Sequence, residues 1–194
     1  MKYKNPHLLV FGAMTVIFLG IFIGWPEGYA QVISARKADS YFIKAVEGQS
    51  FLGLEMLKGL RASDPPDVIV NAIDKYLVDL QKRESLPKDA WYDVYTPLGT
   101  LWGEQIGYAY GWEWERVWLD EDAGEFSHAL VSPNRSMVIY PFRHLKECIE
   151  TDRFVSVSLV FRSLGQNTKL SELPPGSYTD LLANLALLVM SEEQ

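Results

Sequence analysis

Three side chains of this sequence have the types from which an acid–base or metal site is built: Glu104, His128 and His144. Imidazole and carboxylate groups transfer protons near neutral pH, and both are common zinc ligands. A pocket that brought the three together would suit an enzyme. Their spacing does not require one, because the chain has no HExxH motif and no CxxC pair. We expect structural or surface histidines, and we assign no metal, cofactor or catalytic residue.

Nucleophilic and phosphate-binding motifs are equally weak. The chain has no GxSxG turn, and its regular glycine spacing is not the GxGxxG of dinucleotide-binding loops. Cys148 is the single cysteine, so no disulfide can form within the chain. We expect Cys148 to be a buried apolar residue. Catalysis by a covalent nucleophile is therefore not predicted.

A tryptophan-rich segment offers a binding surface. In a strand, alternate residues share a face, which places Trp112, Trp114, Arg116 and Trp118 together. The opposite face would carry Glu113, Glu115, Val117 and Leu119. We expect the tryptophan face to pack in the core. Two alternatives are a surface for a partner protein and a flat platform for sugar rings.

The charge of the chain limits its partners. The formal net charge is −7 over 194 residues. Nucleic acid is therefore not an expected partner, because its binding depends on basic side chains that meet phosphates. Acidic residues follow Glu104 at Glu113, Glu115, Asp120, Glu121, Asp122 and Glu125. We expect a solvated charged surface, although the same residues gathered at one sheet edge would receive a basic protein.

The elements that position these residues fall into a helical part and a sheet-containing part. Residues 31–90 are predicted to be helical. The first helix is expected to break near Gly48 or Gly53, and a second helix follows the turn at residues 63–67. Residues 91–194 begin with a helix over residues 98–110, with Pro97 in its first turn. Glycines at Gly99, Gly103, Gly107 and Gly111 predict a smooth ridge that another backbone approaches closely.

An antiparallel meander follows the glycine-rich helix. Strands are predicted from Trp112, over residues 126–132 and over residues 137–140, with turns between them. Pro141 opens a helix, residues 154–164 fit either a strand or a helix, and a last helix carries its apolar side from Leu181 to Val189. The predicted fold is α+β: residues 31–194 form one domain with a small antiparallel sheet of about three strands, flanked by several helices.

Residues 1–30 form a leader that determines where this domain resides. Its uncharged run begins at Leu8 and ends at Trp25, after Lys2 and Lys4. As a helix the run rises roughly 27 Å, close to the roughly 30 Å hydrocarbon core of a bilayer. We expect a membrane anchor. A signal peptide cleaved after Ala30 is the alternative, and it would leave a secreted or periplasmic protein.

The charges that flank the apolar run give a weak indication of how the predicted anchor is oriented in the membrane. Lys2 and Lys4 precede the apolar run, whereas Arg36, Lys37 and Lys44 follow it at a greater distance. We favour an N-terminus inside the cell and a domain outside the cytoplasm, in a single-pass bacterial membrane protein. A cytoplasmic domain suspended from the membrane is the other arrangement.

The central segment resembles an uncharacterised bacterial domain family. The resemblance rests on Leu98, Gly99, Gly103 and Glu104 in an LGxxxGE helix, on the strand that begins GWEW at residues 111–114, and on VIYP at residues 138–141. It covers about a quarter of the chain. Proteins of similar organisation include immunity proteins that neutralise bacterial toxins, so the resemblance implies binding rather than catalysis.

Together these features predict a non-enzymatic protein, membrane-tethered or exported, that acts by binding another protein, either immunity-like or as a subunit of an envelope complex. Its binding residues are expected among Trp112, Trp114, Arg116, Trp118 and Glu104. Two alternatives are an envelope enzyme with a Glu104–His128–His144 pocket and a carbohydrate-binding module that uses exposed tryptophans.

Overall fold

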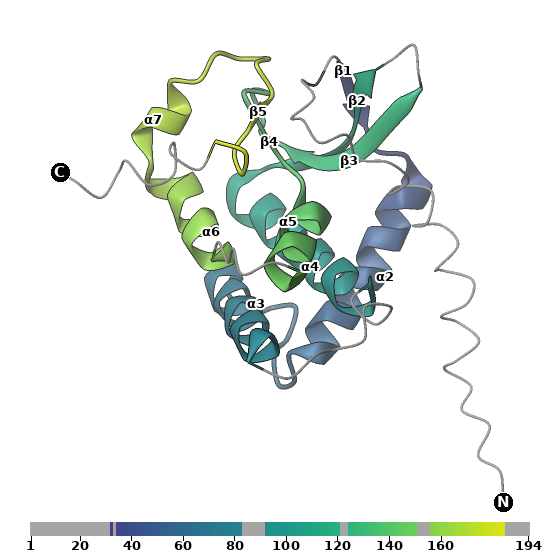
Figure 1. Ribbon diagram of the computed structural model, residues 1–194, viewed down its shortest axis with the longest axis vertical. Helices are drawn as coiled ribbons and strands as arrows, with labels where there is room; N and C mark the ends of the chain where they lie inside the picture. The colour runs from purple at the N-terminus through teal and green to yellow at the C-terminus, as the bar shows by residue number, and fades with distance from the viewer. Residues whose placement is uncertain (1–31, 33, 83–91, 121–123, 151–155, 185–194) are drawn as a thin grey trace, which may run out of the picture.

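The sheet and its helices are described by a computed structural model that covers residues 32, 34–82, 92–120, 124–150 and 156–184. Within these ranges the chain is α+β (Figure 1). The strands are β1 (Ser34–Lys37), β2 (Glu113–Asp120), β3 (Glu125–Val131), β4 (Met137–Ile139) and β5 (Thr179–Asp180). The helices are α2 (Ser40–Met56), α3 (Pro66–Gln81), α4 (Tyr92–Tyr110), α5 (Pro141–Glu150), α6 (Val157–Gln166) and α7 (Thr168–Ser171).

The sheet has five strands in the order β1-β2-β3-β4-β5. The predicted meander of β2, β3 and β4 is confirmed as antiparallel. The size of the sheet was underestimated, because β1 adds an antiparallel edge and β5 adds a parallel one. The sheet is therefore mixed rather than purely antiparallel. Both additional strands are short and take their backbone partners from segments far away in the sequence.

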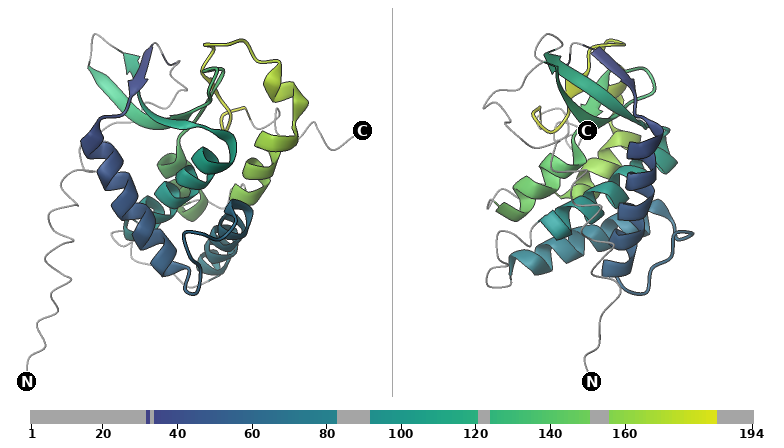
Figure 2. Two further views of the ribbon diagram at one scale, coloured as in Figure 1. Left: turned by 180° about the vertical axis from the view of Figure 1, so that it is seen from behind. Right: turned by 90° about the vertical axis from the view of Figure 1, so that its right-hand side faces the viewer.

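Helix α4 is the centre of the helical layer. It packs against α2, α3 and α5, while α3 also packs on α6. Figure 2 shows the sheet at one end of the molecule and most of the helices at the other, with α4 beneath the sheet and α7 at the height of the sheet. The main core extends from this layer to the sheet face that covers it, and its fully buried helical residues include Trp102, Ile73, Leu77, Ile106 and Leu145. A smaller apolar cluster, with Val117 and Val138, lies on the opposite face of the sheet.

The glycine ridge of α4 has the predicted role of allowing close contact. A Cβ added to Gly99 would lie 3.2 Å from the Phe142 ring, and one added to Gly107 would lie 3.1 Å from the Trp112 carbonyl oxygen. At Gly103 the Trp114 indole occupies the space that a side chain would need. The ridge therefore receives aromatic rings as well as backbone. Gly111 lies beyond the end of the helix with φ +72°.

Several predicted boundaries are wrong. Residues 34–37 form β1 instead of helix, and α2 begins after the N-cap Asp39 and continues through Gly48 and Gly53 without a break. Helix α4 begins at Tyr92, so Pro97 lies inside it. The ambiguous segment forms α6, capped by Ser156. These differences arise because tertiary contacts set the ends of elements that local patterns specify weakly.

The predicted C-terminal helix, from Leu181 to Val189, lies only partly within the described residues. Thr179 and Asp180 form β5, and residues 181–184 form a turn in which the Asp180 carboxylate accepts hydrogen bonds from the Leu182 and Ala183 amides. The remaining predicted positions, to Val189, lie outside the described residues. The predicted anchor at residues 8–25 also lies outside them. Among the helices of the described ranges, none combines the length and the apolar composition that spanning a bilayer requires.

Candidate functional site

Glu104, the first of the three candidate acid–base residues, lies on α4 where it faces α2. Its Oε2 accepts a hydrogen bond from the Ser50 hydroxyl. Burial raises the pKa of the Glu104 carboxyl above its ordinary value, the Ser50 bond opposes that shift, and the charge of Glu47 adds to it. Glu104 is thus a half-buried acid paired with a serine.

The two histidines lie in other environments. His144 is buried on α5, with its Nε2 3.7 Å from the Cys148 sulfur and its ring tilted against Trp102 at 5.3 Å. His128 is buried on β3, and neither ring nitrogen has a hydrogen-bond partner. His128 therefore forms no hydrogen bond with Glu104 or His144. No group of three His, Cys, Asp or Glu side chains that could hold a metal ion occurs in the described ranges.

The tryptophans divide between core and surface. Trp112 and Trp114 are buried, and Trp114 stacks on Phe142 with centroids 5.5 Å apart and meets Phe42 edge-on at 5.6 Å. Trp118, at the other end of β2, is partly exposed. A flat sugar platform needs neighbouring exposed rings, and burial of Trp112 and Trp114 removes them from such a surface.

An arginine–aromatic surface occupies the end of the sheet where Trp118 emerges. We define it as Arg36, Arg116, Trp118 and Phe126, contributed by β1, β2 and β3. The Arg36 guanidinium carbon lies 5.2 Å from the Trp118 ring centroid, and that of Arg116 lies 4.5 Å from the Phe126 ring centroid. The Trp118 and Phe126 rings, directly paired across the strands, have centroids 6.1 Å apart. These distances are those of cation–π and aromatic contacts.

The alternation of side chains explains why one strand face is core at one end and surface at the other. Trp114, Arg116 and Trp118 share the predicted face of β2, and their cross-strand partners are Leu130, His128 and Phe126. Figure 2 shows the distal end of β2 and β3 extending beyond the first turn of α2. The Trp114 end is therefore covered by helices, whereas Phe126 is 40% exposed.

Asp39 fixes the arginine–aromatic surface to α2. One carboxylate oxygen accepts the Phe42 amide at 2.8 Å and so caps the helix, and the other accepts a hydrogen bond from the Arg116 guanidinium. The backbone hydrogen bond from Phe42 holds the pKa of the Asp39 carboxyl below its ordinary value, and Arg116 adds to the shift. Sequence reasoning missed this link, although an aspartate directly before Ser40 is a typical N-cap signal.

A small acidic groove lies between α2 and α4. Its cavity volume is about 220 Å³, and its walls include Glu47, Ser50 and Glu104. Two aromatic side chains, Phe51 and Tyr108, also line it and are 61% and 72% exposed. The raised pKa of the Glu104 carboxyl follows from this placement. Sequence reasoning named Glu104 but not its partner Ser50, which lies 54 positions away in the chain.

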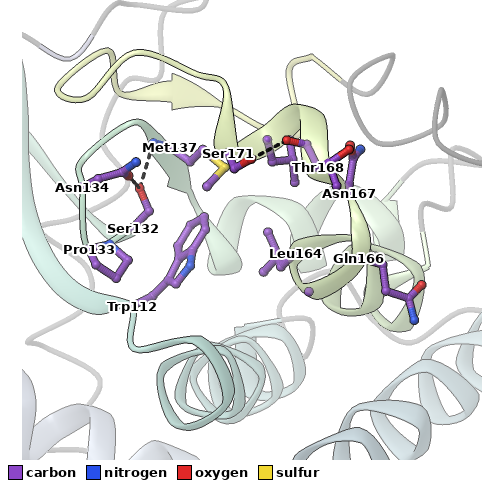
Figure 3. Close-up of a pocket in the computed structure, with 12 residues that line it drawn as sticks. Trp112, Ser132, Pro133, Asn134, Met137, Leu164, Gln166, Asn167, Thr168 and Ser171 are labelled. Carbon is purple, nitrogen blue, oxygen red and sulfur yellow. Dashed lines mark hydrogen bonds between the residues drawn. The ribbon is translucent and has the colours of Figure 1, made fainter.

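A larger polar cleft lies between the β3–β4 turn and the α6–α7 segment (Figure 3). Its cavity volume is about 530 Å³. Trp112 lines it, in a position between Pro133 and Leu164 in Figure 3, with Asn134 on one side and Gln166 on the other. Except for Trp112, its lining residues were not predicted, because no local pattern relates residues 132–137 to residues 164–171.

Comparison with known proteins adds no relative from which a role could be transferred. No family model matches the chain, and no curated protein or solved structure matches it. The resemblance to a bacterial domain family stays a prediction. The function must therefore be argued from the surfaces described above.

Proposed function

We propose that this protein is a non-enzymatic binding protein, tethered to the bacterial membrane by residues 8–25, that docks a partner protein on its arginine–aromatic surface. The observation that carries the proposal is the exposed Phe126 ring beneath the Arg116 guanidinium, next to Trp118. Tryptophan, tyrosine and arginine dominate the energetically important positions of protein interfaces. This surface therefore supports binding better than catalysis.

The surface is ordered before a partner arrives. Arg116 is held by Asp39 and by the Phe126 ring, so its guanidinium has little freedom left to lose on binding. Exposed Arg36 lies over the same Trp118 ring that Arg116 approaches at 5.9 Å. A partner carboxylate would meet two guanidinium groups and an aromatic edge. We therefore expect a partner that presents an acidic side chain next to an apolar one.

The proposed tether fixes where the partner resides. β1 begins at Ser34, so residues 26–33 link it to the end of the apolar run. Even fully extended, that link spans no more than about 30 Å. Arg36 on β1 would consequently stay near the membrane surface. We therefore expect a partner domain outside the cytoplasm, at a similar distance from the membrane. If the leader is cleaved after Ala30, the same surface would act in an exported protein.

Site-specific photocrosslinking from full-length protein in membranes tests the proposal. A photoreactive side chain at position 126 is compared with one at position 51, because Phe51 is also an exposed phenylalanine but lies in the acidic groove. We expect one defined protein adduct from position 126, lost in the Arg116→Gln variant, and no such adduct from position 51. Equal adducts from both positions, adducts with lipid alone, or none at position 126 would contradict the proposal.

A further inference from the structure

The polar cleft next to Trp112 has the dimensions of a small-molecule site. Its volume of about 530 Å³ lies within the range of roughly 300–1,000 Å³ that is usual for ligand pockets. Three separate stretches of chain form it: the α4–β2 junction, the β3–β4 turn and the segment that joins α6 to α7. It involves none of the residues of the arginine–aromatic surface, so it is a second and independent feature.

The chemistry of its walls restricts the ligand. Every lining side chain is uncharged, although 22% of the residues of the chain are charged. The lining residues are Trp112, Ser132, Pro133, Asn134, Met137, Leu164, Gly165, Gln166, Asn167, Thr168, Leu170 and Ser171. An anion or cation would find no opposite charge there, and a purely hydrocarbon ligand would desolvate the amides without replacing their hydrogen bonds. The ligand must therefore be neutral and polar, with an apolar face.

Hydrogen bonds within the β3–β4 turn hold Asn134 in place. Its Oδ1 accepts the Ser132 hydroxyl at 3.0 Å and the Ser136 amide at 3.1 Å. The Asn134 amide nitrogen takes no part in these bonds, so it is available as a donor from a fixed position. Across the cleft, exposed Gln166 can both donate and accept. Such amides on two sides match a ligand that carries hydroxyl groups on its edges.

We propose that the polar cleft binds a short neutral saccharide. The apolar face of one sugar ring would lie on the accessible Pro133 and Leu164 side chains, next to the edge of the buried Trp112 indole, with its hydroxyl groups on Asn134 and Gln166. A pyranose ring has an apolar C–H face that packs on apolar side chains and a rim of hydroxyls that bonds to amides. Figure 3 shows the indole between the Pro133 and Leu164 side chains, which extend the apolar floor. The site differs from a platform of exposed tryptophans because one indole lies within a cleft.

Binding of two neutral trisaccharides to the full-length protein in detergent tests this proposal. The probes are N,N′,N″-triacetylchitotriose and maltotriose, with adenosine as a neutral polar molecule of another class. Titration followed by the indole N–H signals in nitrogen-15 NMR reports the site, and the Trp112→Phe variant assigns the Trp112 signal. We expect at least one trisaccharide to bind with a Kd of roughly 1 mM or tighter and to move the Trp112 signal but not that of Trp118.

Matched variants separate the site from its surroundings. Gln166→Ala should weaken binding about fivefold or more, because it removes one amide from the cleft. Lys169→Ala, an exposed neighbour that does not line the cleft, should leave binding unchanged, as should Phe126→Ser on the arginine–aromatic surface. Absence of binding by both trisaccharides, binding of adenosine alone, or equal affinity of the Gln166→Ala variant would overturn the proposal, whatever the outcome of the crosslinking experiment.

Discussion

The imidazole ring of His128 lies face to face with the phenyl ring of Phe42, with centroids 3.6 Å apart and planes inclined by 4°. This stack joins β3 to α2 directly behind the Asp39–Arg116 ion pair. Burial, assisted by the nearby positive charge of Arg116 and opposed by Asp39, lowers the pKa of His128 to about 4. A histidine considered for acid–base chemistry therefore acts as an aromatic core residue beneath the arginine–aromatic surface.

The lowered pKa of His128 predicts acid sensitivity. In the unfolded chain the imidazole takes up a proton near pH 6.5, whereas in the fold it does so near pH 4. Between these values the unfolded state binds more protons, so the free energy of unfolding falls as the pH falls, by at most about 3 kcal/mol. Urea unfolding at pH 7 and at pH 4.5 measures this change. Between the two pH values, the free energy of unfolding should fall less for His128→Leu than for the wild type. Equal losses would contradict this assignment.

Asp74 on α3 is predicted to hold the start of α6. Its carboxylate accepts the hydroxyls of Ser156 and Ser158 at 2.7 and 2.9 Å and the Val157 amide at 2.9 Å. Removing the carboxylate leaves several donors without a partner, so Asp74→Ala should lower the free energy of unfolding by about 2–3 kcal/mol. Chemical denaturation at neutral pH measures this loss.

The control for Asp74 is Asp79 on the same helix. Its side chain is exposed and lies 3.7 Å from that of Lys82, an ion pair of the surface type. Asp79→Ala should change the free energy of unfolding by less than about 0.5 kcal/mol. If the two variants are equally stable, the Asp74 hydrogen bonds do not hold α6 in the way described.

Gly103 is predicted to tolerate no side chain. The Trp114 indole fills the position of a Cβ at this residue, and the Leu130 side chain lies 3.2 Å from it. Gly103→Ala would gain helix propensity of about 1 kcal/mol, yet displacing a packed indole costs about 1–3 kcal/mol or more. We expect net destabilisation with a shift in tryptophan fluorescence. Ala109→Gly, on the exposed part of the same helix, measures the propensity effect alone.

Glu104 is predicted to weaken the fold when it ionises. Its folded-state pKa is raised by burial, so the stability associated with its protonated form is present at low pH and is lost as the pH rises through that value. Glu104→Gln keeps the shape and an acceptor for Ser50. At pH 7 it should raise the free energy of unfolding by about 0.5 kcal/mol, a small value because the carboxylate is partly exposed. The gain should disappear near pH 4; a gain of the same size there would contradict the raised pKa.

Local patterns determined much of the architecture. Apolar residues at helical spacing predicted α3, where Ile69, Ile73 and Leu77 are buried, and Pro141 correctly marked the start of α5. Alternation in β2 correctly placed Trp114, Arg116 and Trp118 on one face. These features depend on residues within a few positions of one another, and for that reason they can be read from the amino-acid sequence.

Only the tertiary structure decided the edges of the sheet and the candidate sites. β1 and β5 are too short to carry a pattern of their own, and their pairing depends on strands elsewhere in the chain. The Arg116 guanidinium donates a hydrogen bond to Asp39, 77 positions away in the chain. Trp112 and Gln166 line one cleft only because the α4–β2 junction and α6 lie close together in the fold. Side-chain type and spacing fix which face of an element a residue occupies. Packing between distant elements determines whether that face is core, as at Trp114, or surface, as at Phe126.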